Sequence, residues 1–167
     1  MNYQSVNPYD GTTGKIYDRM SDAQLDAAIE TAAKGFEKWR LTSFADRSAV
    51  LMKAASLMRE RIEELAPLVT QEMGKLISES KIEVNLTAGV LEYYAKNAER
   101  FLAPEPLKPL DGEAKIENTP LGVLLGIQVW NLPYHLLARF AAPNLMAGNV
   151  VMVKHAEGVP ECALAFD

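Results

Sequence analysis

The chain has 167 residues, a net charge of −5 and 49% hydrophobic residues, which suits one ordinary folded core. Its Lys and Arg residues are dispersed, which excludes a basic nucleic-acid surface, and no apolar run approaches the ~18 residues of a membrane span. A single cysteine excludes an internal disulfide framework, and the amino terminus lacks the features of a secretory signal, so a cytoplasmic protein is predicted.

The chain begins with a predicted hairpin or extended arm over residues 6–16, which turns at Asp10-Gly11. Ser21 and Gln24 then form the sequence pattern of a capping box. Apolar residues at helical spacing continue from there to Phe36 and predict the first helix.

Three further helical segments are predicted by the same spacing, at 44–58, 65–73 and 78–101. Gly74 is a C-terminal glycine cap for the second of these, and Pro67 predicts a chain break near Glu63. The longest helix carries an apolar stripe of Ile82, Leu86, Val90, Tyr94 and Phe101. Three prolines then end the helical half, and residues 115–118 are a candidate strand.

The segment 120–157 predicts a strand, a helix and a second strand. Residues 123–129 and 150–153 are apolar runs typical of parallel strands that are buried on both faces. Between them, Pro133 ends the first run, 134–146 has helical spacing, and Gly148-Asn149 is a helix stop. Ligands of open parallel sheets bind beyond the carboxyl ends of the strands, where Trp130, Asn131, Lys154 and Glu157 fall.

These residues carry a resemblance to a known family. The run Val129-Trp130-Asn131-Leu132-Pro133, the turn Ala147-Gly148-Asn149 and the close Lys154-His155-Ala156-Glu157 resemble the first βαβ unit of the NAD(P)-dependent aldehyde dehydrogenase superfamily. Asn7-Pro8, Asp10-Gly11 and Glu72-Met73-Gly74-Lys75 extend the resemblance over essentially the whole chain. The Lys-His-Ala variant, with Val159-Pro160 and Cys162-Ala163 after it, is most similar to bacterial succinate-semialdehyde dehydrogenases.

The resemblance implies an α/β fold, with amino-terminal helices and the first βαβ unit of an incomplete Rossmann-like parallel sheet. Residues 1–103 are then arm and helices, 104–120 a linker with the β-arm that joins subunits, and 121–167 the start of the cofactor-binding unit. Family members are considerably longer and homo-oligomeric. The chain is therefore expected to be a truncated, amino-terminal portion, which exposes apolar surface and self-associates.

Asn131 is the residue to which the resemblance assigns catalysis. The family oxidises aldehydes through a cysteine thiolate, and its W-N asparagine donates an N–H to the developing oxyanion. The resemblance implies the same role for Asn131. Without the surrounding motif, an asparagine before Leu132-Pro133 is simply a turn former.

The cofactor, NAD or NADP, is implied to lie along Val129, Trp130, Asn131, Lys154, His155, Ala156 and Glu157. In the family the motif Lys and Glu hold the adenine ribose hydroxyls. A carboxylate accepts hydroxyl bonds and repels a 2′-phosphate, so Glu157 favours NAD. The alternatives are a solvated Lys154 and Glu157 after a strand, and Trp130 as a core-packing wall. Arg139 on the apolar helix could pair with a carboxylate that the sequence does not identify.

Cys162 is rejected as the nucleophile, since it lies in a Pro160-Glu161-Cys162-Ala163 helix start and not in the family's glycine-rich cysteine motif. The family's catalytic cysteine motif and its E-L-G-G general-base motif do not occur in the 167 residues. The two histidines have no metal-ligand spacing, so no metal site is predicted. The chain alone is expected to bind dinucleotide weakly and to be inactive. The alternatives are a non-catalytic remnant or interaction fragment, and an independent nucleotide-binding module.

Overall fold

Helices dominate the computed structural model of the chain, which describes residues 3–166. Residues 1, 2 and 167 lie outside the described part. The prediction about a secretory signal at the amino terminus and the last residue of the predicted final helix therefore fall partly outside the described residues. The helices are α1 (Asp22–Trp39), α2 (Phe44–Glu60), α3 (Ile62–Met73), α4 (Ile77–Phe101), α5 (Pro133–Met146) and α6 (Pro160–Phe166). The strands are β1 (Tyr3–Val6), β2 (Thr13–Tyr17), β3 (Glu105–Leu107), β4 (Ala114–Ile116), β5 (Val123–Ile127) and β6 (Val150–Lys154).

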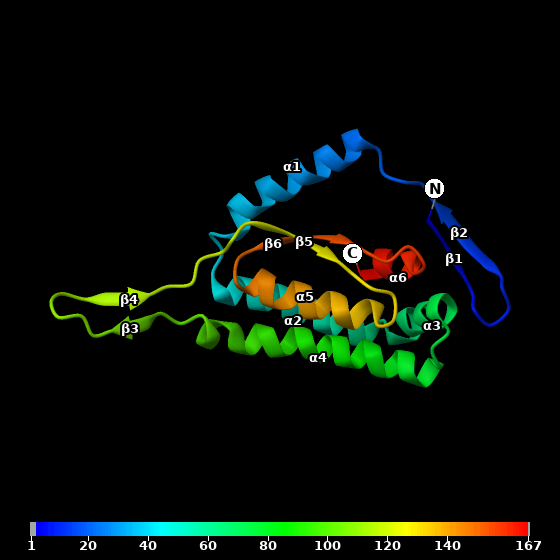
Figure 1. The fold of residues 1–167 in the computed structure, drawn as a ribbon. Helices are drawn as coiled ribbons and strands as arrows, with labels where there is room; N and C mark the ends of the chain where they lie inside the picture. Colours follow the sequence, from blue (N-terminus) through cyan, green and yellow to red (C-terminus); the bar gives the residue numbers. More distant parts are fainter. Residues whose placement is uncertain (1–2, 167) are drawn as a thin grey trace.

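The elements stack in layers around the strand pair β5–β6 (Figure 1). α1 lies over one face of this pair and contacts both strands, while α5 lies on the other face. α2 and α4 pack against α5 on its far side, so of the long amino-terminal helices it is α1 that packs on the sheet as expected. The β3–β4 hairpin extends away from the body, and the β1–β2 hairpin lies at the opposite end near α3 and α6 (Figure 1).

β5 and β6 are parallel neighbours, as predicted, in a register that runs from Val123 opposite Val150 to Ile127 opposite Lys154. The prediction that both faces of these strands are buried is wrong for the described residues, because Leu125 and Ile127 are 65% and 76% exposed. α5 covers only one face, and α1 lies too far toward β6 to cover the other completely.

Local sequence signals account for the helix ends. The Ser21–Gln24 capping box opens α1 as predicted, and Ser43 forms a second capping box with Asp46 at the start of α2. Gly74 ends α3 in the left-handed conformation with φ of 80°, which a glycine adopts without steric cost. The chain breaks at Arg61, close to the predicted place, although Pro67 lies in the second turn of α3 rather than the first.

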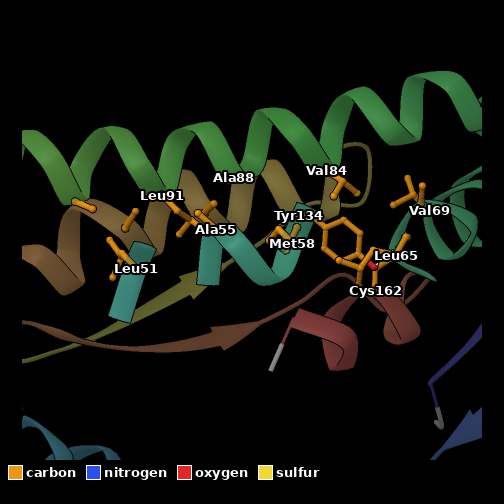
Figure 2. Close-up of a cluster of buried hydrophobic side chains, with 14 of the residues drawn as sticks. Leu51, Ala55, Met58, Leu65, Val69, Val84, Ala88, Leu91, Tyr134 and Cys162 are labelled. Carbon is orange, nitrogen blue, oxygen red and sulfur yellow. Dashed lines mark hydrogen bonds between the residues drawn. The ribbon is translucent and has the colours of Figure 1, made fainter. Parts of the chain in front are cut away.

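The core lies where α2, α3, α4 and α5 meet (Figure 2). Leu51, Leu65, Val84 and Tyr134 are among its fully buried side chains. The predicted apolar stripe of α4 is not its buried face: Ile82 is 64% exposed and Leu86 and Phe101 are exposed as well, while Val90 and Tyr94 are half-buried against the core. The buried face carries mostly small residues together with Glu83 and Leu91, and consists of Ser80, Glu83, Val84, Thr87, Ala88, Leu91, Ala95 and Ala98. Small side chains let α4 approach α2 and α5 closely, which is why this face is the inner one.

Two buried polar side chains join segments that are distant in sequence. Arg47 donates to the Met146 carbonyl at the end of α5 (2.9 Å) and to the Arg40 carbonyl at the end of α1 (3.1 Å). Asn149 accepts from the backbone N–H groups of Leu121 (2.6 Å) and Gly122 (3.0 Å), and so sets the entry of β5 beside β6. None of the helices within residues 3–166 is both long and apolar enough to cross a membrane.

Candidate functional site

The carboxyl ends of β5 and β6 lie side by side and bring the predicted site residues to one edge of the strand pair. The last paired residues are Ile127 and Lys154, and the Gln128 N–H donates to the Lys154 carbonyl at 2.9 Å. The segment 129–131 therefore leaves β5 next to the segment 154–157 that leaves β6. This is the edge at which open parallel sheets bind their ligands.

Most of the predicted site side chains are accessible at this edge. Val129 and Trp130 are 51% and 57% exposed, and Asn131 is exposed as well. Trp130 is therefore not a core-packing wall within residues 3–166. Neither Asn131 nor Glu157 has a side-chain hydrogen bond to the described residues, so both side chains are free to meet a ligand.

Lys154 is also exposed, but its ammonium has two contacts. It donates to the His155 carbonyl at 2.5 Å and lies 5.1 Å from the ring centre of Tyr3, within cation–π range. These contacts are weak competitors for a charged ligand because both are solvent-exposed.

His155 connects the two strand ends. Its Nδ1 accepts from the Ala156 N–H at 3.0 Å, so its Nε2 carries the proton and donates to the Pro133 carbonyl at 3.2 Å. Burial lowers the pKa of His155, although the bond to Pro133 opposes this shift. The neutral imidazole thus ties the end of β6 to the first residue of α5, while Ala156 is half-buried behind it.

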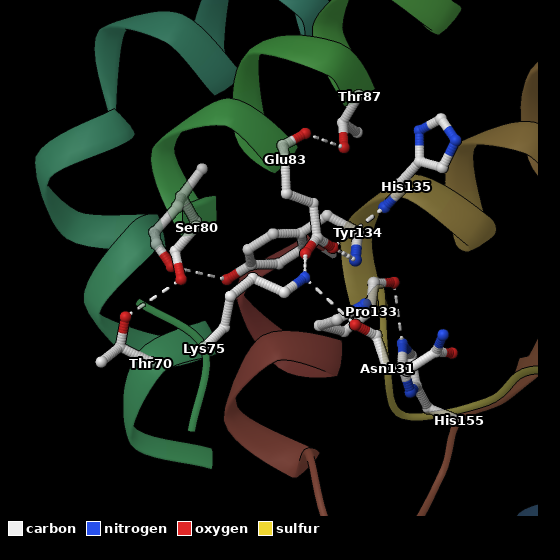
Figure 3. A network of polar contacts seen from close by, with 11 residues as sticks. Thr70, Lys75, Ser80, Glu83, Thr87, Asn131, Pro133, Tyr134, His135 and His155 are labelled. Carbon is white, nitrogen blue, oxygen red and sulfur yellow. Dashed lines mark hydrogen bonds and ion pairs between the residues drawn. The ribbon is translucent and has the colours of Figure 1, made fainter. Parts of the chain in front are cut away.

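The N-terminus of α5 is capped by a carboxylate from another helix (Figure 3). The N-cap residue Leu132 has no side-chain acceptor, and Glu83 of α4 takes its place. Glu83 Oε1 accepts from the backbone N–H groups of Tyr134 (3.0 Å) and His135 (3.4 Å). The Glu83 side chain is 1% exposed and forms an ion pair with Lys75, whose ammonium also donates to the Asn131 carbonyl at 3.1 Å.

The N-terminus of α6 is capped in the same way. Glu72 of α3 accepts from the backbone N–H groups of Glu161 and Cys162, both at 2.9 Å. Burial raises the pKa of Glu72, and the two backbone bonds oppose that shift. Cys162 is fully buried and burial raises the pKa of its thiol, which is the opposite of what a nucleophilic thiolate needs.

These two caps limit how a dinucleotide can lie at this edge. A helix N-terminus after a parallel strand is the usual place for a pyrophosphate, because its free N–H groups and dipole attract anions. Here the first N–H groups of α5 and α6 are already bonded to buried carboxylates. An anion at this edge therefore needs partners other than the N-termini of α5 and α6, and Lys154 is the exposed cation there.

An open cavity of about 400 Å³ lies between α4 and α5 on the outward side of the bundle. Apolar and aromatic residues line most of it, and His135 and Arg139 of α5 contribute its polar groups. Burial lowers the pKa of His135, so its ring is neutral. Arg139 is exposed and has no carboxylate partner within residues 3–166.

The chain thus contains a parallel strand–helix–strand unit with polar side chains past both strand ends, which is the arrangement of an α/β protein. The sequence profile of the aldehyde dehydrogenase family matches residues 1–166, and the chain belongs to that family.

Among curated proteins, it is 45% identical to a succinate-semialdehyde dehydrogenase [NADP(+)] of Deinococcus radiodurans, over 99% of this chain and 35% of the relative. It is 41% identical to a probable succinate-semialdehyde dehydrogenase [NADP(+)] of Synechocystis, over 97% and 36%. A crystal structure of succinic semialdehyde dehydrogenase from Streptococcus pyogenes with NADP+ matches with a TM-score of 0.94 at 35% identity, over 98% of this chain and 36% of that one.

The chain thus spans about a third of the length of the curated relatives it matches. Both relatives are named as NADP(+)-dependent enzymes, whereas Glu157 predicted a preference for NAD. For this chain the preference for NAD stays a prediction.

Lys75, Glu83 and Glu72 were not identified as site residues from the sequence. The motif Glu72-Met73-Gly74-Lys75 carries the family resemblance but predicts no role for its residues, and the sequence predicts none for Glu83. A signal was present, since Ser80, Glu83 and Thr87 recur at helical spacing and form a polar stripe on a helix that is otherwise rich in apolar residues. Two helices that begin with proline and have no capping side chain of their own also called for outside acceptors.

Proposed function

We propose that this chain is the amino-terminal part of a succinate-semialdehyde-type aldehyde dehydrogenase, which uses NADP or NAD to oxidise succinate semialdehyde to succinate. Family membership over residues 1–166 and the named relatives support the reaction class. The observation that carries the proposal is the exposed Asn131 amide past the carboxyl end of β5, which has no side-chain hydrogen bond to the described residues.

Asn131 is the proposed oxyanion donor. An amide N–H stabilises the charge that develops on the aldehyde oxygen, and it carries no charge that must be desolvated. Its side chain has no partner among the described residues and would not have to break a bond in order to act. The cofactor, when bound, supplies the acceptor for the hydride.

Arg139 is the proposed partner of the substrate carboxylate. Asn131 lies two positions before α5 and Arg139 lies in its second turn, about 9 Å along the axis from Pro133. His135 and Arg139 are four residues apart on α5 and both line the apolar cavity, whereas Asn131 precedes the helix and is not among the lining residues. Arg139 therefore offers a guanidinium to a substrate carboxylate at an apolar cavity beside the first two turns of α5.

The cofactor contacts are proposed to lie on the adenosine side, along Val129–Asn131 and Lys154–Glu157. Lys154 is a suitable partner for a 2′-phosphate and Glu157 for ribose hydroxyls, so the pair accommodates either cofactor. With the pyrophosphate not held at α5 or α6, the chain alone is expected to bind dinucleotide with a Kd of about 1 mM or weaker, which corresponds to a binding free energy no more favourable than about −4 kcal/mol.

The chain alone is proposed to be inactive, because its sequence contains neither the cysteine nor the general-base motif of the family. A second candidate function, a non-catalytic interaction fragment, is favoured by the exposed apolar face of β5, where Leu125 and Ile127 lie. Aldehyde-dependent reduction of NADP or NAD by the purified chain is the first test. Turnover that disappears in Cys162→Ser would show that Cys162 is the nucleophile after all.

The catalytic roles are tested in a chimera that joins residues 1–166 to the remaining part of the Deinococcus radiodurans relative. Asn131→Ala is expected to lower kcat by about 10²–10³. Arg139→Gln is expected to raise KM for succinate semialdehyde and to leave KM for butanal, which has no carboxylate, unchanged. An unchanged kcat in Asn131→Ala, or an equal rise of both KM values in Arg139→Gln, contradicts the proposed roles.

The cofactor assignment has its own test in the same chimera. Glu157→Gln is expected to weaken binding of NAD more than binding of NADP, because only the ribose hydroxyls use the carboxylate. The reverse order removes Glu157 from the ribose role.

A further inference from the structure

Lys75 lies where three segments meet (Figure 3). Its side chain is only 11% exposed, and its ammonium bonds both the Glu83 carboxylate of α4 and the Asn131 carbonyl that precedes α5. A lysine is rarely this buried unless its charge is paired. The ion pair with Glu83 meets that requirement, and the bond to Asn131 is made in addition.

Glu83 completes a closed chain of bonds around the start of α5. One of its oxygens bonds Lys75 and the other accepts from the N–H groups of Tyr134 and His135. The sequence from Asn131 to Tyr134 is therefore held at both ends by the same buried pair. Leu132 and Pro133, between these ends, offer no side-chain acceptor.

The backbone that carries Lys75 is itself constrained. Gly74 has φ of +80°, and a Cβ at this position would lie 2.7 Å from Cγ of Pro8. The turn between α3 and α4 thus requires glycine for two reasons: its backbone has a positive φ, and a side chain at this position would clash with Pro8. It directs Lys75 toward Asn131, and Glu72, on the other side of the same turn, caps α6.

We propose that Lys75 and Glu83 are positioning residues for Asn131, which fix its backbone so that the side-chain amide projects from the strand edge. The catalytic meaning of this position rests on the proposed function, whereas the positioning itself does not. A plain structural ion pair would contribute only to overall stability. The pair Lys81–Glu63, which links α4 to α3 on the surface, is the control for loss of a lysine–glutamate ion pair without a bond to Asn131, although it is more exposed than Lys75–Glu83.

The positioning is tested on the full chain by nuclear magnetic resonance. In Lys75→Met the backbone of Asn131 is expected to change from ordered to mobile, with an order parameter below about 0.6. The N–H groups of Tyr134 and His135 are expected to exchange about tenfold faster or more, because the Glu83 carboxylate that accepts from them loses the ammonium that holds it in place. Lys75→Arg restores both properties, and Lys81→Met changes neither. An Asn131 that stays as ordered in Lys75→Met as in the parent chain overturns the proposal, and so does an equal effect of Lys81→Met.

Glu83→Gln keeps the proposal testable if Lys75→Met does not fold. Its amide oxygen still accepts from the N–H group of Tyr134, but the charge that holds Lys75 is lost. The expected result is a mobile Asn131 next to a Tyr134 N–H that remains protected. An Asn131 as ordered as in the parent chain overturns the proposal.

The catalytic meaning is tested in the chimera, where Lys75→Met should lower kcat with little change in KM for the cofactor, and Lys75→Arg should recover kcat. If Asn131→Ala leaves kcat unchanged in the same chimera, the proposed function fails, while the resonance measurements still decide the positioning. If Asn131→Ala lowers kcat and Lys75→Met does not, the positioning fails by itself.

Discussion

Gly126→Ala is expected to destabilise the chain through one steric contact. A Cβ at position 126 would lie 2.4 Å from Cε1, 2.6 Å from Cδ1 and 2.8 Å from Cζ of Phe140. Carbon atoms pack at about 3.5–4.0 Å, so the ring has to move by roughly 1 Å and loses its place between β5 and α5. The φ of Gly126 is not positive, so the cost is steric and not conformational.

The size of the effect follows from the cost of overpacking. An inserted methyl group in a packed interface costs about 1–3 kcal/mol. For a chain of this size, 1 kcal/mol corresponds to about 2–4 °C in Tm, so a drop of about 4–8 °C is expected at the middle of the range. The measurement is urea and thermal unfolding followed by tryptophan fluorescence.

Two further variants separate the steric contact from other effects. Gly35→Ala in α1 is the matched control, since nothing lies within 4 Å of its added Cβ. It is expected to stabilise the chain by about 0.4–1 kcal/mol, the opposite sign for the same chemical change. Phe140→Leu removes the ring atoms that clash, so Gly126→Ala should cost much less in that background. A Gly126→Ala chain as stable as its parent, or a cost unchanged by Phe140→Leu, would refute the reasoning.

The remaining predictions concern pH and association. Glu72→Ala should cost about 1–3 kcal/mol, and Glu72→Gln less, because glutamine keeps an acceptor for α6; equal losses in urea titration would contradict the capping role. Burial raises the pKa of Glu72 above 4.5, so the folded state holds the Glu72 proton more tightly than the unfolded state. The stability that this proton contributes is fully present below pH 4.5 and is lost as pH rises through the folded pKa. Glu72→Gln should remove this dependence of stability on pH. Burial lowers the pKa of His155 below 6.5, so the unfolded state takes up the proton first and stability falls as pH falls below 6.5; a His155→Gln chain with the same slope would exclude this source. Sedimentation and binding of a hydrophobic dye should show that the chain self-associates. Ile127→Glu on the open sheet face should reduce this association, and Leu110→Glu in the hairpin loop should not. A parent chain that sediments as a compact monomer without dye binding would instead favour an independent nucleotide-binding module.

The sequence by itself determined the local structure of the chain. Ser21 with Gln24 and the Gly74 cap are interactions within a few residues, periodicity located the helices, and apolar runs located the two parallel strands. The resemblance carried by residues 129–133 and 154–157 identified the family, which the match over residues 1–166 confirms. These features depend on neighbours along the chain, so residue order alone contains them.

Only the tertiary structure decided how the site is held. Glu83 caps a helix that begins 50 residues further along, and Glu72 reaches N–H groups 89 and 90 residues away. Which face of α4 is buried was decided by close packing with α2 and α5, which buries a face of mostly small residues and leaves Ile82, Leu86 and Phe101 of the apolar stripe exposed. A periodic pattern specifies that a helix has faces but not which neighbour each face meets. Contacts between segments far apart in the chain therefore set the partners of Lys75, Glu83 and Asn131.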